Sequence, residues 1–124
     1  MARARAYLSR MDEAILRSIE AIHAGPYRCV VAATGAGSEA IAWLLRVPGA
    51  SATLLEAVVP YAGRALSEFL GSAPAHAVAR ETAAAMAARA LARAQHLNEG
   101  DAPLVGVGAT GALATCRLHR GEHR

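Results

Sequence analysis

Two glycine-rich turns hold the residues whose types and spacing are best suited to chemistry. They are Thr34-Gly35-Ala36-Gly37-Ser38 and Gly108-Ala109-Thr110-Gly111-Ala112. Glycines let a backbone approach a phosphate closely, and free N–H groups at a helix start present the positive end of its dipole to an anion. Thr34, Ser38 and Thr110 add hydroxyl groups that can hydrogen-bond to the same ligand. The turns therefore predict a site for a phosphate or another anion, although such turns also occur as simple corners between a strand and a helix.

Alternating helices and strands must position these turns. Ile15, Ile19 and Ile22 recur at helical spacing on one face. Ser38 is expected to cap a helix whose inward stripe is Ile41, Leu44 and Leu45. The predicted helices cover residues 12–25, 39–47, 62–71 and 74–97. The predicted strands cover residues 27–33, 50–60 and 104–108. The first of them contains the apolar run CVVAA and is expected to be buried on both faces.

This alternation predicts one α/β domain over residues 1–124, a layered sandwich with a largely parallel sheet flanked by helices. Residues 1–10 are expected to be a flexible basic lead-in, and residues 117–124 a tail. In a parallel sheet both glycine turns lie outside the carboxyl ends of the strands, where ligands of open α/β folds bind. The sequence thus predicts that the two turns form one site.

All 13 basic side chains are arginine, and the chain contains no lysine. Arginine stays protonated, so a Schiff base, a P-loop ammonium and a lysine general base are excluded. The formal charge of +3 is spread along the chain without interleaved aromatic residues, which argues against a nucleic-acid partner. Composition therefore favours a small-molecule ligand.

The location is predicted to be cytoplasmic. Cys29 and Cys116 have no CxxC spacing, so neither a disulfide framework nor a zinc site is indicated. The arginines of MARARAYLSR are not followed by the apolar segment of a signal peptide, and no apolar run approaches the length of a membrane span. We therefore expect no membrane partner.

The stretch VVAATGAGSEAIAWLLRVPGASATLLEAVVPYAGRALSEFLG, the long helix after it and PLVGVGATGALA together resemble the CinA C-terminal domain family, the nicotinamide mononucleotide (NMN) amidohydrolases or deamidases. That family has a strand into an A-E-S-C-T-G-G-type turn, a helix ending near P-G-A-S, a strand closing on V-x-Y-[ST]-N-x-x-K and a later strand into S-G-I-A-G-P. The similarity runs from about Cys29 to the end of the chain. It implies a CinA-like fold and hydrolysis of a nucleotide carboxamide to a carboxylate and ammonia, with no cofactor.

The resemblance also assigns site residues. It places the nucleophilic serine of the family on Thr34, its motif tyrosine on Tyr61, and the loop that contacts the phosphate or amide on Gly108 to Gly111. The lysine that helps to activate the serine falls on Leu66, and the acidic residue of A-E-S falls on Ala33. A threonine hydroxyl needs a base partner to act as a nucleophile, and the sequence shows none nearby.

The C-terminal residues raise two further possibilities. His119, Glu122 and His123 match the H-x-x-E-H zinc pattern, but Gly121 interrupts any helix and no third ligand is visible, so no metal site is expected. Arg120 is a candidate phosphate ligand if the tail folds back. The family continues into further strands beyond this point, so the resemblance implies an incomplete domain whose open sheet edge favours a homo-oligomer.

Three functions from different classes remain open. In the first, the chain is an NMN amidase: Thr34 attacks the substrate or positions a water molecule, Tyr61 assists, and the N–H groups of residues 35–37 form an oxyanion or phosphate hole. Alternatively it is a catalytically silent CinA-like domain, a pseudoenzyme that keeps a nucleotide or phosphate pocket. The third possibility is an assembly module in which the turns are only corners.

Overall fold

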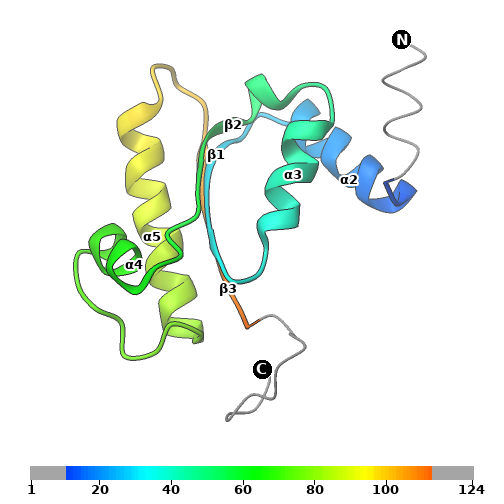
Figure 1. Cartoon of the computed structure of the whole chain (residues 1–124). Helices are drawn as coiled ribbons and strands as arrows, with labels where there is room; N and C mark the ends of the chain where they lie inside the picture. The colour runs from blue at the N-terminus through cyan, green and yellow to red at the C-terminus, as the bar shows by residue number, and fades with distance from the viewer. Residues whose placement is uncertain (1–10, 113–124) are drawn as a thin grey trace.

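The computed structural model describes residues 11–112, which form a parallel sheet with helices on both faces (Figure 1). The strands are β1 (Arg28–Thr34), β2 (Leu54–Val58) and β3 (Leu104–Thr110), in the spatial order β2-β1-β3. On one face lie α2 (Glu13–Ala24) and α3 (Ser38–Arg46), and on the other α4 (Gly63–Leu70) and α5 (Arg80–Leu97); the short 3-10 helix η1 (Ala50–Ala52) precedes β2. The predicted layered α/β class with a parallel sheet is confirmed for these residues.

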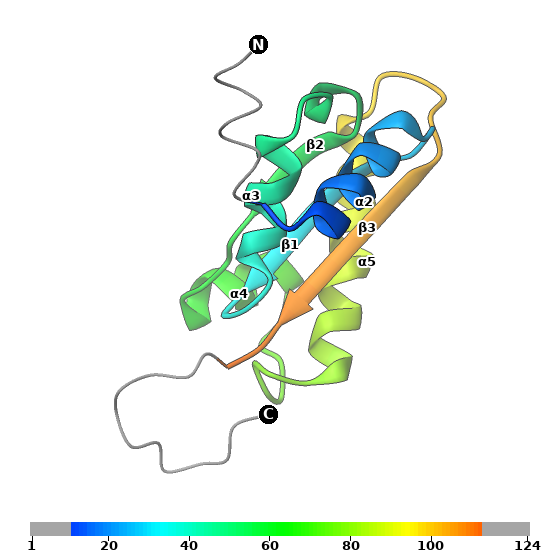
Figure 2. The same cartoon turned by 90° about the vertical axis from the view of Figure 1, so that its right-hand side faces the viewer.

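The strands run in one direction, so their carboxyl ends meet at one edge of the sheet, which we call the carboxyl edge. The chain passes from β1 through α3 to β2, and from β2 through α4 and α5 across β1 to β3 (Figure 2). Because α3 and α4 directly follow strands, and α5 leads back to the start of β3, all three helices begin at the carboxyl edge. The fold therefore gathers three helix N-termini there.

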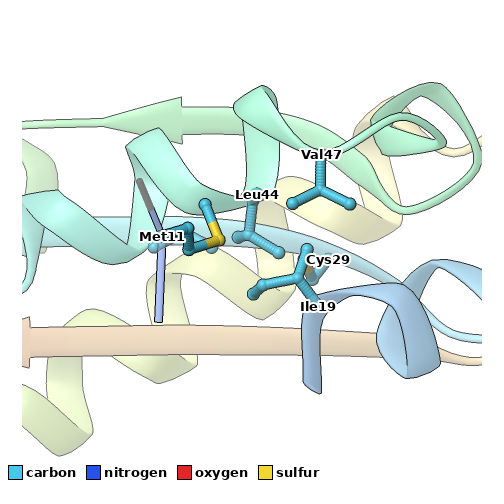
Figure 3. Close-up of a cluster of buried hydrophobic side chains, with 6 residues drawn as sticks. Met11, Ile19, Cys29, Leu44 and Val47 are labelled. Carbon is cyan, nitrogen blue, oxygen red and sulfur yellow. The ribbon is translucent and has the colours of Figure 1, made fainter. Parts of the chain in front are cut away.

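Two apolar clusters hold the layers together, one on each face of β1. On the α2 and α3 side, Ile19, Cys29 and Leu44 pack with Met11 and Val47 (Figure 3). On the α4 and α5 side, the buried residues are Val30, Ala32, Leu66, Met86, Ala90 and Ala94. The alternation of Cys29 and Val31 with Val30 and Ala32 along β1 follows from the period of two in a strand. The predicted burial of this strand on both faces is confirmed.

Helix α5 lies directly against the backbone of β3. A Cβ atom on Gly106 would lie 2.2 Å from the carbonyl oxygen of Ala87, and one on Gly108 would lie 2.3 Å from that of Ala83. Any side chain at either position would push the helix off the strand. These two glycines therefore set the distance between α5 and the sheet, and with it the place where α5 begins relative to the end of β3.

The ends of several elements differ from the sequence-based expectation. Helix α5 begins at Arg80 rather than at Pro74, and residues 72–79 form a loop. Ser38 is the first residue of α3 and not its cap; the N-cap is Gly37, in the left-handed region with φ 92°, and no side chain caps the helix. By contrast, Asp12 caps α2 by accepting hydrogen bonds from the N–H groups of Ala14 and Ile15.

Between residues 11 and 112 no helix is long and apolar enough to cross a membrane.

Candidate functional site

The carboxyl edge brings Thr34 and Thr110 into facing positions. They are the last residues of β1 and β3 and are Cα partners in the parallel ladder. Thr34 lies on the same face of β1 as Val30 and Ala32, so its side chain points to the α4 and α5 side of the sheet. The two hydroxyl-bearing residues are therefore neighbours on one face.

The two hydroxyl groups differ in their hydrogen bonding. Thr110 Oγ1 donates to the carbonyl oxygen of Ala77 over 2.8 Å. Thr34 is only 7% exposed, yet within the described part of the chain its hydroxyl has no hydrogen-bond partner. Among the described residues, the buried side-chain nitrogen and oxygen atoms without a partner are Arg28 Nε and Asn98 Oδ1, so the hydroxyl of Thr34 is not a buried orphan group. It is a hydroxyl at the end of the sheet that makes no bond to a described residue, as a group that binds a ligand or a water molecule does.

Residues 108–110, predicted as part of the second turn, belong to β3, and the first turn is in direct contact with the end of this strand and with Gly111. A Cβ atom on Gly35 would lie 1.9 Å from the carbonyl oxygen of Gly111, and one on Gly37 would lie 2.8 Å from Cβ of Ala109. Gly35 and Gly37 have φ values of 77° and 92°, which favour glycine. No ligand fits between Gly35 and Gly111 themselves, so any ligand of this edge lies beside the pair of turns rather than between them.

Part of the backbone of the first turn is already engaged. The carbonyl oxygen of Thr34 accepts from the N–H of Ala36 at 2.9 Å and from the N–H of Gly111 at 3.3 Å. The N–H of Ala36 is therefore not available for the oxyanion hole expected from residues 35–37. Ser38 and Glu39 stand in the first turn of α3, where N–H groups lack helical partners, and neither donates to another backbone acceptor within residues 11–112.

Three helices point uncapped N-termini at this edge. The N-cap residues of α3, α4 and α5 are Gly37, Ala62 and Ala79, and none of them supplies a side-chain cap. Each N-terminus bears a partial positive charge. The acidic residues in these first turns are Glu39 in α3 and Glu81 in α5, and both are exposed. The backbone thus favours an anion at the carboxyl edge, with two carboxylates opposing it from the solvent side.

Tyr61 and Leu66 lie in and after the connection from β2 to α4. Tyr61 is 74% exposed, and no hydrogen bond joins its hydroxyl to another described residue. Tyr61 follows the end of β2, and no hydrogen bond joins it to Thr34. Leu66, the position on which the lysine of the family falls, is 3% exposed and packs in the cluster with Val30 and Met86. A charged side chain there would be buried in an apolar core.

Open cavities lie beside the carboxyl edge on the α5 side. One of about 1000 Å³ is lined by Thr110, the loop residues 75–79, and Arg80, Glu81 and Ala83 at the start of α5. A volume of this order can hold a ligand of nucleotide size. The loop that forms its wall was expected to be helical, so sequence reasoning missed it. The only signal for a break was Pro74, because the alanines around it favour a helix.

His23, near the end of α2, belongs to the scaffold. Its Nε2 lies 3.0 Å from the carbonyl oxygen of Leu44 and its Nδ1 lies 2.8 Å from Thr53 Oγ1. A carbonyl can only accept, so Nε2 donates to Leu44, and in the neutral ring Nδ1 then accepts from Thr53. The ring thus ties α2 to α3 and to the start of β2.

Two other titratable groups away from the edge are perturbed for structural reasons. Burial raises the pKa of the Cys29 thiol, which keeps it protonated and unreactive. Arg93 of α5 donates to both carboxylate oxygens of Glu56 in β2, at 2.8 and 3.2 Å, and this lowers the pKa of Glu56. Neither group points to a reaction.

Four candidate residues lie outside the described residues: Arg120 and the His119, Glu122 and His123 set. Within residues 11–112 no group of three His, Cys, Asp or Glu side chains could hold a metal ion.

No protein-family model matches this chain, and no curated protein or solved structure matches it at a significant level.

Proposed function

We propose that this chain binds a phosphate-bearing small molecule, a nucleotide by its resemblance to CinA-like domains, at the carboxyl edge of β1 and β3. The observation that supports the proposal most is the hydroxyl of Thr34. This hydroxyl belongs to the last residue of β1, makes no hydrogen bond to a described residue and lies next to Thr110 at the end of the sheet. An oxyanion beside it would satisfy the hydroxyl.

The surroundings of Thr34 favour a negative charge. The first turn of α3 offers the N–H groups of Ser38 and Glu39, and the N-termini of α4 and α5 add their dipoles. The left-handed glycines at 35 and 37 let the chain turn sharply enough to bring these groups together. The cavity next to Thr110 has room for the rest of a nucleotide.

Hydrolysis of an NMN-like carboxamide is the second candidate. The hydroxyl of Thr34 makes no hydrogen bond to a described residue, and this favours hydrolysis, because a nucleophile must not be engaged elsewhere. Against it, no described acid, base or imidazole hydrogen-bonds to Thr34, Ala33 replaces the acidic residue of the family turn, and Leu66 occupies the lysine position in the core. Binding without turnover is therefore the function that these residues support best.

One experiment separates these functions. Purified protein is incubated with NMN while ammonia release and the melting temperature are followed in parallel, with Thr34→Val as the matched control. Under the proposal, NMN raises the melting temperature of the wild type without releasing ammonia, and the shift is lost in Thr34→Val. Ammonia release that depends on Thr34 would instead establish the amidase. If NMN causes neither a melting-temperature shift nor ammonia release, the result supports the third possibility, an assembly module in which the turns are only corners.

The homo-oligomer and the cytoplasmic location remain predictions from the sequence.

A further inference from the structure

The loop over residues 72–79, which we call the strap, crosses the α5 side of the carboxyl edge. Within residues 11–112, its residues 72–78 make no backbone hydrogen bond to another backbone group. Two threonine hydroxyls hold it instead: Thr82 Oγ1 donates to the carbonyl oxygen of His76, and Thr110 Oγ1 donates to that of Ala77. The strap is thus fastened by side chains and not by a backbone ladder.

Cavities lie on both sides of the strap. The larger, of about 1000 Å³, reaches Thr110, and the smaller, of about 420 Å³, reaches Ser72 and Thr82. Both are lined by Ala75, His76, Ala79 and Glu81. The strap therefore forms the partition between two spaces at the proposed binding edge.

The hydroxyl of Thr110 can donate only one hydrogen bond, and it donates this bond to the carbonyl oxygen of Ala77. An oxyanion at the carboxyl edge can accept a hydrogen bond from Thr34 at once. It can accept one from Thr110 only if Thr110 turns away from Ala77. A ligand that presents a donor group would meet the lone pairs of Thr110 and leave this bond in place.

We propose that Thr110 couples oxyanion binding to release of the strap: the ligand accepts the hydrogen bond that Thr110 otherwise donates to Ala77, the carbonyl oxygen of Ala77 loses its donor, and the strap opens on the side of the larger cavity. This inference rests on the proposed anion site. It assigns Thr110 as a positioning residue whose two partners, Ala77 and the ligand, exclude each other.

Native-state trypsin cleavage after Arg80, the first residue of α5 beyond the strap, tests the coupling by mass spectrometry. Cleavage after Arg93, in the body of α5, reports general unfolding. Loss of one hydrogen bond predicts that Thr110→Val raises cleavage after Arg80 about two- to tenfold, whereas Thr110→Ser matches the wild type. An unchanged rate in Thr110→Val would show that the bond does not hold the strap, whatever the ligand does.

Inorganic phosphate and NMN, each against chloride at equal ionic strength, supply the ligand arm. Both are expected to raise cleavage after Arg80 in the wild type and to add nothing in Thr110→Val. In the control Thr82→Val, which frees only His76, the increase is expected to persist. Binding detected by calorimetry with an unchanged or slower cleavage overturns the coupling but not the site. Absence of binding overturns the proposed function and this inference together.

Discussion

Thr34 and Thr110 lie side by side at the ends of β1 and β3, and of their two hydroxyl groups only that of Thr110 has a hydrogen-bond partner among the described residues. A parallel ladder puts equivalent ends of neighbouring strands side by side, so the pairing is a property of the fold. The unequal hydrogen bonding is a property of the site. It leaves the hydroxyl of Thr34 without a described partner at the edge of the sheet where the uncapped helices α3, α4 and α5 begin.

Thr34→Val is expected to leave stability within about 0.5 kcal/mol of the wild type, because the substitution keeps the shape and removes a hydroxyl that bonds to no described group. Thr53→Val is the matched control. Thr53 is 1% exposed and donates to His23, so its loss is expected to cost about 1–3 kcal/mol. Urea unfolding of both variants measures the difference. Equal destabilisation would mean that Thr34 has a structural role.

Gly35→Ala is expected to lower the free energy of unfolding by about 1–3 kcal/mol or more, because its left-handed φ and the carbonyl of Gly111 both exclude a side chain. Gly63→Ala, at the open first position of α4, is expected to be neutral or slightly stabilising. Thermal unfolding compares the two. If Gly35→Ala has the same melting temperature as the wild type, the contact between Gly35 and Gly111 is not formed in solution.

Gly108→Ala tests the contact between α5 and β3. Its Cβ would lie 2.3 Å from the carbonyl oxygen of Ala83, and overpacking of this kind costs about 1–3 kcal/mol. Gly100→Ala, with open space around it, is the control. Denaturant midpoints provide the measurement, and a midpoint for Gly108→Ala as high as that of Gly100→Ala would contradict the close packing.

The Glu56–Arg93 pair predicts a pH dependence of stability. The pKa of Glu56 is lowered in the folded state, so the pair stabilises the fold above the unfolded pKa of about 4.3 and loses this effect as the pH falls through the lower folded value. The loss of unfolding free energy in Glu56→Gln, relative to the wild type, should therefore be present at neutral pH and vanish in acid. Because both side chains are partly exposed, the effect is expected to be small. A deficit that stays constant into acid would assign it to packing instead.

Local patterns predicted most of the fold. The apolar run of β1 and the isoleucine spacing of α2 depend on neighbours in sequence, and both elements form close to where they were expected. The predicted apolar faces were wrong at two positions, since Ile22 is 45% and Leu45 is 60% exposed. The start of α5 was placed wrongly because alanine favours a helix from Pro74 onward. The bonds from Thr82 and Thr110 that accompany the strap come from residues farther along the chain.

The candidate site was predictable only in outline. That both glycine turns lie at one edge follows from parallel strands. The pairing of Thr34 with Thr110 depends on the register between β1 and β3, which the sequences of the two strands do not determine. The contact of Gly35 with Gly111, and the solvent-exposed position of Tyr61, likewise depend on tertiary packing.

Calorimetric titration of the wild type and Thr34→Val with NMN and with inorganic phosphate tests the central claim most directly. We predict saturable binding of both ligands to the wild type and its loss in Thr34→Val, with the variant still folded by circular dichroism. Equal binding to the two proteins would contradict the assignment of Thr34, and no binding to the wild type would contradict the site itself.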